Sequence, residues 1–341
     1  MLLVSSLAYA RVFLLPVVLS FLLTMVFTPI RRFLSRRGVA SGVSAVLIVG
    51  TLLAVLIAGV LLLAEPVRGW IADAPEIGRK VEAQLQGVLG SAEEVIRATE
   101  QVDEIASPDD QNDVQEVVVR RPGIVANLAA TAPGALAEIG FTLVLLLLLL
   151  ASGDMFYEKI VQVMPTFKDK RQAMRIARDI ETKLSRYLFA ITVINAGLGI
   201  AIGTAMWLIG MPNALLFGVI GFVFNYVPFV GAFAGVAIAT LVGLVSFDVP
   251  AYGLLAGGVY LALTSIEAQL VTPYFVGRQL KMNTVVVFLS IAFWAWLWSI
   301  MGMLVAVPLL VAIRAFSEHI PVLYPLGAFL SARGTEVTES R

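Results

Sequence analysis

Glu267 is the residue of this sequence best placed to do chemistry, because it is a carboxylate isolated among apolar residues. Uncharged stretches of 18 and 10 residues flank it. An ionisable side chain at membrane depth costs about 2.5 to 3.5 kcal/mol on insertion scales, so such a group usually faces a cavity or a partner. Gln269 and Thr272 could coordinate a solute nearby, and Pro273 could free a backbone carbonyl. These four residues are the first candidate binding site.

Glu267 has two interpretations. A desolvated carboxylate can take up and release a proton, as a group that couples transport to protons or cations must do. The alternative is a structural carboxylate at a helix end in the interfacial layer, because Arg278 and Lys281 follow shortly after it.

A second candidate is an interruption in the longest uncharged stretch. No charged side chain occurs in residues 187–247, yet residues 225–231 read Asn-Tyr-Val-Pro-Phe-Val-Gly. A membrane-crossing helix needs about 20 apolar residues, so the stretch accommodates two or three crossings, one of them broken by Pro228 and Gly231. Broken helices inside a bilayer are tolerated where the freed backbone lines a protected cavity or a solute path. Asn225 would add its amide to that lining.

A similar interruption occurs later in the chain. From Asn213 to Gly231 is 18 residues. From Asn283 to Gly302 is 19, and Ser299 lies shortly before this second glycine. Paired, Gly- or Pro-interrupted apolar segments are typical of secondary transporters built from repeats, so we expect two re-entrant helical hairpins whose tips approach the solute. The alternative is that Gly and Pro are simply common in membrane helices.

The composition is that of a polytopic membrane protein. Hydrophobic residues make up 59% of 341 and charged residues 14%, and the mean hydropathy is +0.90. The 24 basic and 24 acidic residues leave no basic surplus to hold phosphates, so nucleic acid is not an expected partner. The sequence has no cysteine and therefore no disulfide or thiolate metal site.

The sequence carries no recognisable catalytic motif. It has no nucleophile elbow, no phosphate loop and a single histidine, His319, which we interpret as an interfacial residue at a helix end. We therefore expect a protein that is not an enzyme and needs no cofactor. Without a phosphate loop, its energy would come from an ion gradient, with H⁺ or Na⁺ as coupling ion.

Loop charges set the expected orientation. Four arginines lie within residues 31–37, after the first apolar segment, and the positive-inside rule places them in the cytoplasm. Residues 65–121 carry 13 acidic and 6 basic residues, which fits an extracytoplasmic location. Residues 154–186 carry 5 acidic and 8 basic residues, which fits the cytoplasm. Ala8-Tyr9-Ala10 mimics a cleavage site, but no basic residue precedes it, and we expect no cleaved signal peptide.

These patterns predict an all-α polytopic membrane protein with about seven or eight transmembrane or half-membrane helices. Apolar residues at helical spacing, from Ile77 to Ile105, predict an amphipathic helical insertion outside the membrane. We divide the chain into N-terminal transmembrane helices with a cytoplasmic basic loop (1–64), the extracytoplasmic amphipathic helical domain (65–132), a transmembrane helix (133–153), a cytoplasmic amphipathic helix (154–186), a transport domain with interrupted helices (187–320) and a C-terminal tail (321–341).

With these residues in view, the chain resembles the AI-2E transporter family over nearly its whole length. Each motif is weak alone, but their combination in this order is specific. The motifs are Leu15-Pro16 and Thr28-Pro29 followed by the arginines, Ile209-Gly210-Met211-Pro212-Asn213, residues 225–231, Ile266-Glu267 with Val271-Thr272-Pro273 and Gly277-Arg278, and residues 298–308, which include Gly302 and Pro308.

The resemblance implies an all-helical permease or exporter of the bacterial inner membrane. It further implies a homo-oligomer, with a pentamer as the candidate state, and a mobile domain built from two helical hairpins. Members of the family have been linked to export of the signal autoinducer-2 and to exchange of sodium or lithium for protons. The family name therefore leaves the substrate open.

The chain departs from the family pattern in two places. Members usually have one more hydrophobic segment before the one that contains Pro16, and here only residues 1–10 remain, so that span is either lost or encoded upstream. Where many members have Asn after Glu-Gly, this chain has Ala268-Gln269, which keeps an amide but lengthens it.

We therefore expect a secondary transporter that moves a small polar solute of the autoinducer-2 kind by alternating access. Hairpin tips at residues 225–231 and 299–302 would gate its site. An alternative is a monovalent cation/proton antiporter in which Glu267 exchanges the ions. From another class, the chain could be a non-transporting membrane scaffold that recruits partners through residues 65–121. A scaffold, however, has no use for interrupted helices and a carboxylate at membrane depth.

Overall fold

The described part of the chain is helical. The computed structural model describes the backbone of residues 2–100, 124–153, 155, 158–159, 162, 166–247, 249–276, 282–318 and 320–331. Side chains are described for residues 5–70 and, from 133 onward, for all of these residues except 168, 169, 276 and 321. In these ranges the extended backbone pairs only at an isolated bridge between Met282 and Ser331. The predicted all-α fold is confirmed.

Eight apolar segments account for the expected seven or eight membrane or half-membrane helices. Among the described residues, six helices are long and apolar enough to cross a membrane, and two shorter apolar helices lie between them. In chain order the elements are α1 (Leu2–Tyr9), α2 (Arg11–Arg36), α3 (Ser41–Glu100), α4 (Ile124–Ser152), α6 (Phe167–Ile209), α7 (Ala214–Phe224), α8 (Val230–Ser246), α9 (Pro250–Ile266), the π-helical turn η1 (Glu267–Val271), α10 (Thr272–Val276), α11 (Thr284–Ser317), the 3₁₀ turn η3 (Pro321–Leu323) and α12 (Tyr324–Leu330).

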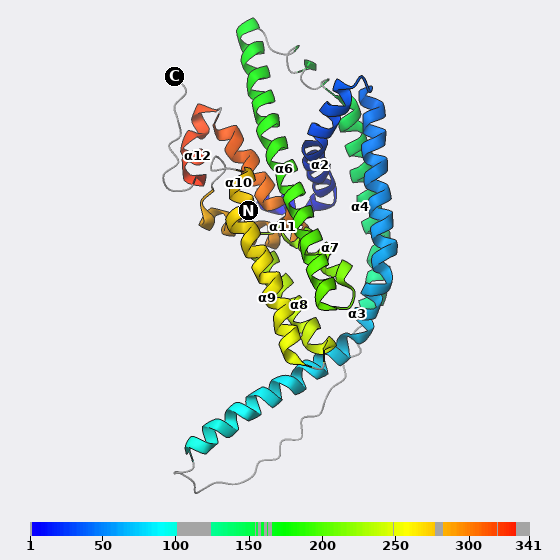
Figure 1. Cartoon of the computed structure of the whole chain (residues 1–341). Coiled ribbons are helices and arrows are strands. Elements are labelled where there is room, and N and C mark those ends of the chain that lie inside the picture. The colour runs from blue at the N-terminus through cyan, green and yellow to red at the C-terminus, as the bar shows by residue number, and fades with distance from the viewer. Residues whose placement is uncertain are drawn as a thin grey trace.

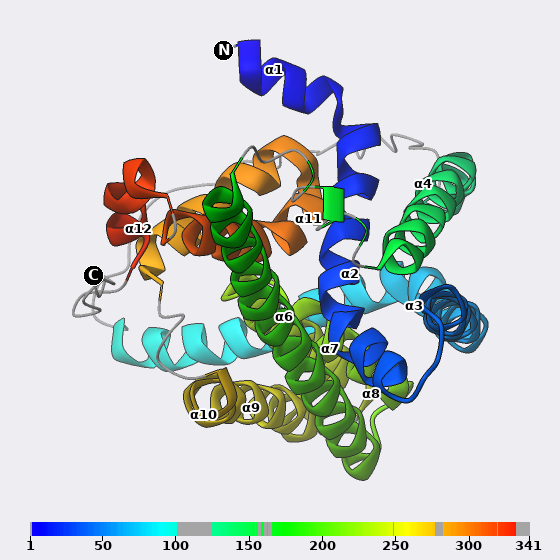
Figure 2. The ribbon, with the colours of Figure 1, turned by 90° about the horizontal axis from the view of Figure 1, so that it is seen from above.

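Helix α6 is the central element of the molecule. Figure 2 shows it crossing the middle of the view, with α2, α3 and α4 on one side, α9 and α10 on another, and α11 and α12 on a third. It contacts α2, α7, α9, α10 and α11. Its 43 residues make it about 65 Å long, so it crosses a bilayer and extends well beyond it. The boundary expected at residues 186/187 falls inside this unbroken helix.

Helix α3 also continues through an expected boundary. Its 60 residues run past residue 64 without a break, and Figure 1 shows the later turns leaving the bundle. Near the point where α3 leaves the bundle, Trp70 contacts Phe217 of α7, with ring centroids 5.3 Å apart and ring planes tilted by 60°. The predicted amphipathic face that begins at Ile77 lies outside the described side chains. Residues 101–123 lie outside the described backbone.

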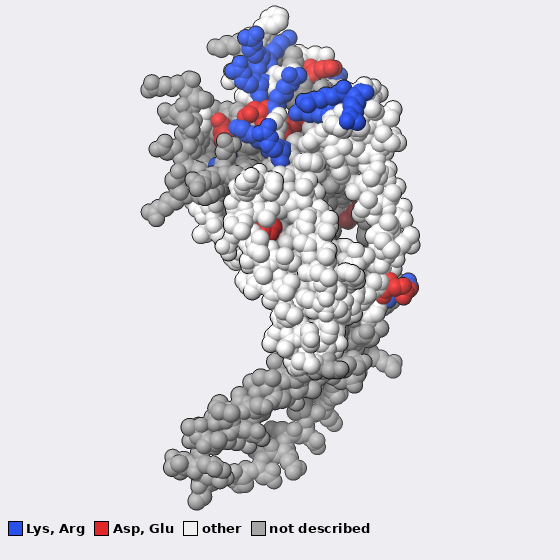
Figure 3. Space-filling view, in the orientation of Figure 1, with Lys and Arg blue, Asp and Glu red and all other residues white. Residues whose placement is uncertain are grey.

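Among the residues whose side chains are described, most of the basic ones gather at one end of the molecule. Figure 3 shows Lys and Arg concentrated where α2 ends and α6 begins, above a broad belt of uncharged residues. The lower edge of this belt on α3 carries the exposed pair Glu65 and Arg68, 3.3 Å apart. The positive-inside rule predicts that this basic end faces the cytoplasm. Arg278, Lys281 and His319 lie outside the described residues.

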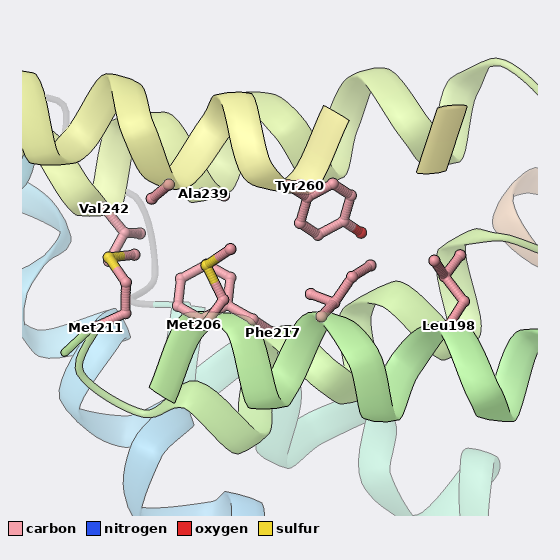
Figure 4. Packing of buried hydrophobic residues seen from close by; sticks show 9 residues of the cluster. Leu198, Met206, Met211, Phe217, Ala239, Val242 and Tyr260 are labelled. Carbon is pink, nitrogen blue, oxygen red and sulfur yellow. The ribbon is translucent and has the colours of Figure 1, made fainter. Parts of the chain in front are cut away.

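The largest buried apolar cluster joins α6 and α7 to α8 and α9 (Figure 4). Leu198 and Met206 of α6 face Tyr260 of α9, while Phe217 of α7 and Val242 of α8 close the cluster near its other end. Lipid tails are as apolar as these side chains, so close van der Waals packing rather than hydrophobic burial favours this contact.

Small residues permit these helices to approach closely. Gly218 of α7 lies so near Gly199 of α6 that a Cβ on Gly199 would come within 2.6 Å of the Gly218 carbonyl oxygen. On the opposite side of the cluster, a Cβ on Gly253 of α9 would overlap the backbone of Leu244 in α8. The spacing Gly-xxx-Gly occurs at both sites, at residues 199–203 and 253–257, and here it marks real helix contacts.

Candidate functional site

The first interruption joins α7 to α8 through a sharp turn. Helix α7 ends at Phe224 and α8 begins at Val230. Between them, the backbone N–H of Val230 donates to the carbonyl of Pro228 over 2.8 Å, and Phe229 has φ 65° and ψ −61°. This is a γ-turn with positive φ at a bulky residue, a rare and strained conformation. A Cβ on Gly231 would overlap the Phe224 carbonyl oxygen, so only glycine fits there.

This tip presents polar side chains to α6. Asn225 Nδ2 donates to Asn195 Oδ1 over 2.8 Å. The Tyr226 hydroxyl donates to Thr192 Oγ1 over 2.9 Å, and Thr192 itself donates to the carbonyl of Leu188. Two polar residues of the turn are therefore tied to two polar residues one turn apart on a single helix.

Asn195 is the most unusual member of this group. It is 1% exposed, and its Nδ2 has no hydrogen-bond partner among the described residues. Leaving a buried donor unpaired costs about 1 to 3 kcal/mol, so this N–H group is a candidate donor to a bound polar molecule. On α6, Asn195 lies about 13 Å beyond Arg186 and about 21 Å before Ile209, well inside the uncharged belt.

Glu267 lies at a change of helix type. Helix α9 gives way to the π-helical turn η1, in which the Thr272 N–H donates to the Glu267 carbonyl five residues earlier. Pro273 has no N–H to donate within an α-helix, which accounts for the wider turn. The Glu267 residue is 8% exposed, and the Thr272 hydroxyl donates to its Oε1.

The polar residues predicted to act with Glu267 do not all lie beside its carboxylate. Thr272 is bonded to the carboxylate, whereas Gln269 and Pro273 are exposed on the outer surface of the segment. Glu267 continues the buried face of α9 that includes Tyr260 and Thr264, at i, i+4 and i+7. Tyr260 packs against α6, so this face directs Glu267 towards the same side of the molecule as α6.

The second interruption folds α11 back on itself. Trp298 and Ser299 leave helical geometry, with φ 57° at Ser299. Val287 and Val307 would be about 30 Å apart in a straight helix, yet both pack against one buried cluster. A Cβ on Gly302 would overlap the Trp294 carbonyl oxygen, just as a Cβ on Gly231 would overlap the Phe224 carbonyl oxygen at the first tip. Ser299 is exposed at this tip, while Gly302 is buried.

The two hairpins start from opposite ends of α6 and meet between them. Near the start of the first hairpin, Met211 packs with Met206 towards the uncharged end of α6. Both ends of α11 pack beside the basic part of α6, where Val311 contacts Ile180 and Leu184. The hairpins touch where Val227 of the first tip packs against Ile291 and Ala306 of the second.

The site therefore combines predicted residues with two that sequence reasoning missed. Asn225, Pro228 and Gly231 form the first tip, Ser299 and Gly302 form the second, and Glu267 and Thr272 form a hydrogen-bonded pair where η1 meets α10. Asn195 and Thr192 were not predicted. A signal existed, because Asn195 shares one helical face with Leu198, Ile202 and Met206 within an uncharged stretch. No cluster of three or more metal-ligating residues occurs in the described part of the chain.

Comparisons with known proteins give one matching family and several relatives. The family model described as AI-2E family transporter matches residues 1–322. The Escherichia coli (strain K12) protein YhhT, named only as a candidate transport protein, is 31% identical over 40% of this chain and 38% of its own length. The AI-2 transport protein TqsA of the same strain is 28% identical over 58% of this chain and 56% of its own length.

A further relative aligns along most of the chain. MT0215 of Mycobacterium tuberculosis, also named as a candidate transport protein, is 25% identical over 92% of this chain and 83% of its own length. For YhhT and TqsA, by contrast, the chain spans about half of the relative or less.

Proposed function

The chain belongs to the AI-2E transporter family and is a multi-pass membrane transporter, and on that premise we propose that it moves a small polar solute across the bacterial inner membrane by alternating access. The observation that carries this proposal is the buried Asn195 amide, which is bonded on one side to the tip residue Asn225 and offers a free N–H donor on the other.

The polar groups around α6 suit a solute rich in hydroxyl and carbonyl groups. Asn195 Nδ2 can donate to a solute oxygen, and the Glu267 carboxylate can accept from a solute hydroxyl. A solute that satisfies the buried donor recovers the cost of leaving it unpaired, whereas an apolar molecule does not. This asymmetry favours a polar solute over a lipid-like one.

Alternating access would use the two tips as gates. The hairpins approach from opposite ends and share one apolar contact, Val227 with Ile291 and Ala306. Withdrawal of one tip would open the buried amide towards one side, and withdrawal of the other would open it towards the opposite side. Re-entrant hairpins around a site near the bilayer midplane are the arrangement that repeat-built secondary transporters use.

The substrate class is proposed from the named relative. TqsA is named for transport of AI-2, a small polar signal, and about half of its length aligns with this chain. We propose export of a solute of this class, with the protein assembled as a homo-oligomer, for which a pentamer is the candidate state. Exposed apolar residues on α3, among them Val43, Val55 and Leu61, provide a face that lipid or a neighbouring copy can cover.

Counterflow of autoinducer-2 in proteoliposomes tests the proposal. Asn225→Ala removes the amide that binds Asn195, and Glu267→Gln removes the buried charge, so each should lower the rate at least about tenfold. Gln269→Ala, at an exposed position two residues from Glu267, serves as the matched control and retains the rate. Wild-type rates in both Asn225→Ala and Glu267→Gln would refute the assignment of the site.

A second candidate function is exchange of a monovalent cation for protons. It is favoured by Glu267, a carboxylate buried within the uncharged belt and bonded to Thr272. In everted vesicles, addition of Na⁺ or Li⁺ would then cause a pH change that Glu267→Gln abolishes, with the exposed Glu65→Gln as control. A signal that persists in Glu267→Gln would exclude this carboxylate as the exchanging group.

A further inference from the structure

An arginine-rich cavity opens at the basic end of the molecule, apart from the site around Asn195. Its volume is about 370 Å³, and it lies between the end of α2, the start of α3 and the cytoplasmic part of α6. The residues that line it and can bind an anion are Arg31, Arg32, Arg36, Arg178, Ser41 and Thr182.

The residues that line this cavity include four arginines and no carboxylate. Arg32 is paired with Glu181 over 2.6 Å, which neutralises one of the four guanidinium groups. Arg31 is buried, with 8% of its surface exposed. Its Nη1 and the Ser41 hydroxyl both lie beside Gly153, at the end of α4. Arg36 and Arg178 are exposed, on different helices, and both face the cavity.

The start of α3 adds backbone donors to the guanidinium groups. Ser41 is the first residue of this helix, and the N–H groups of a first helical turn have no partners within the helix. Planar guanidinium groups together with hydroxyls and a helix N-terminus match the oxygens of a phosphate group.

The surroundings of the cavity indicate that a lipid carries the phosphate. The apolar part of α2 ends immediately before Arg31, so the cavity lies at the level of the lipid headgroups on the cytoplasmic side. Ile30 and Phe33 of α2, and Val43 and Leu47 of α3, are exposed large apolar residues on the two flanking helices. They provide a surface on which acyl chains can lie while the headgroup enters the cavity.

We propose that this cavity binds the phosphate headgroup of an anionic lipid of the cytoplasmic leaflet, such as phosphatidylglycerol or cardiolipin. The bound phosphate bridges Arg36 of α2 and Arg178 of α6. Because α6 also carries Asn195, the lipid holds the transport helix against the α2 to α3 link and thereby stabilises one position of this helix.

Native mass spectrometry of the purified protein tests this proposal with defined lipids. Wild type is titrated with cardiolipin, with phosphatidylglycerol and with neutral phosphatidylcholine, each with and without excess inorganic phosphate. The double variant Arg36→Gln/Arg178→Gln removes the two exposed cavity arginines. The matched control Arg37→Gln/Arg175→Gln removes the same charge from the ends of the same two elements, outside the cavity lining.

The expected result is selective retention of the anionic lipids by wild type and by the control, with at least about tenfold weaker binding in the cavity variant. Thermal unfolding gives a second readout, because added cardiolipin should raise the unfolding midpoint of wild type and of the control but not that of the cavity variant. Equal lipid binding by the two double variants would overturn the proposal. Displacement of the anionic lipid by inorganic phosphate alone, with phosphate retained at the same arginines, would overturn the lipid assignment.

Discussion

The two hairpin tips have the same backbone design but different side chains. Each has a non-glycine residue with positive φ, Phe229 at 65° and Ser299 at 57°. Each also has a glycine two or three residues later that lies against a carbonyl oxygen of the preceding helix. The first tip turns amide and hydroxyl groups towards α6. The second instead carries two indoles in contact, those of Trp294 and Trp298, with ring centroids 4.7 Å apart and ring planes tilted by 49°.

The two tips are also attached to the rest of the protein by different kinds of contact. The first tip is bound to α6 by side-chain hydrogen bonds to Asn195 and Thr192. The second packs on the N-terminal helices, where Trp298 Nε1 donates to the Leu7 carbonyl over 3.2 Å and Leu15 completes the cluster. The comparison indicates that a tip needs strained backbone and a glycine to turn, whereas its side chains decide its role. The polar side chains of the first tip can contact solute, whereas the aromatic side chains of the second tip can close the protein against the N-terminal helices.

The shared backbone design predicts the largest effect. Gly231→Ala and Gly302→Ala each place a Cβ on a backbone carbonyl oxygen that cannot move without unwinding a helix. Each should lower the free energy of unfolding by at least about 3 kcal/mol, measured by thermal unfolding in detergent. Gly197→Ala and Gly258→Ala, where a Cβ would meet nothing within 4 Å, are the controls and should change stability little. Tolerance of alanine at only one tip would show that the two turns are not equivalent.

The contact between the second tip and the N-terminal helices predicts an intermediate effect on stability. Trp298→Phe keeps an aromatic ring in the cluster but removes the donor to the Leu7 carbonyl. Stability should fall by about 1 kcal/mol, and solute counterflow should keep most of its rate. If counterflow instead falls as far as it does in Asn225→Ala, the second tip contacts solute and the proposed division of roles is wrong.

The hydroxyl at the first tip predicts the smallest effect. Tyr226→Phe removes the bond to Thr192, but Thr192 keeps its bond to the Leu188 carbonyl and is not left unpaired. Stability should change by about 0.5 kcal/mol, and counterflow should fall less than tenfold. A loss of transport equal to that in Asn225→Ala would place the tyrosine hydroxyl in the solute site.

The interruptions could be predicted because their signals are local. Pro228, Gly231 and Gly302 restrict the backbone wherever they stand, so both breaks were visible as spacing in the sequence. Long apolar segments and loop charge predicted the membrane helices and the basic end for the same reason. Helices α3 and α6 run unbroken across the expected domain boundaries, because a change in polarity along a helix does not end it.

The composition of the site was predicted only in part, because it depends on which helices meet. Glu267 and Asn225 stand out by residue type. Asn195 becomes a candidate only through its hydrogen bond to Asn225, which lies 30 residues away at the end of another helix. Gln269 lies close to Glu267 in sequence, yet it is exposed on the outer surface of the segment. Sequence proximity therefore did not predict which polar residues share a face.

One measurement tests the central claim that the first tip and α6 form the solute site. Asn195→Leu replaces the buried amide with an apolar side chain of the same branching, and it removes both the unpaired donor and the acceptor of the Asn225 amide. Counterflow of autoinducer-2 and thermal unfolding would be measured on the same preparation. Counterflow should fall at least about tenfold. The free energy of unfolding should change by less than about 1 kcal/mol, because the loss of the bond to Asn225 and the removal of an unpaired donor have opposite effects. Counterflow at the wild-type rate in a stably folded Asn195→Leu protein would contradict it.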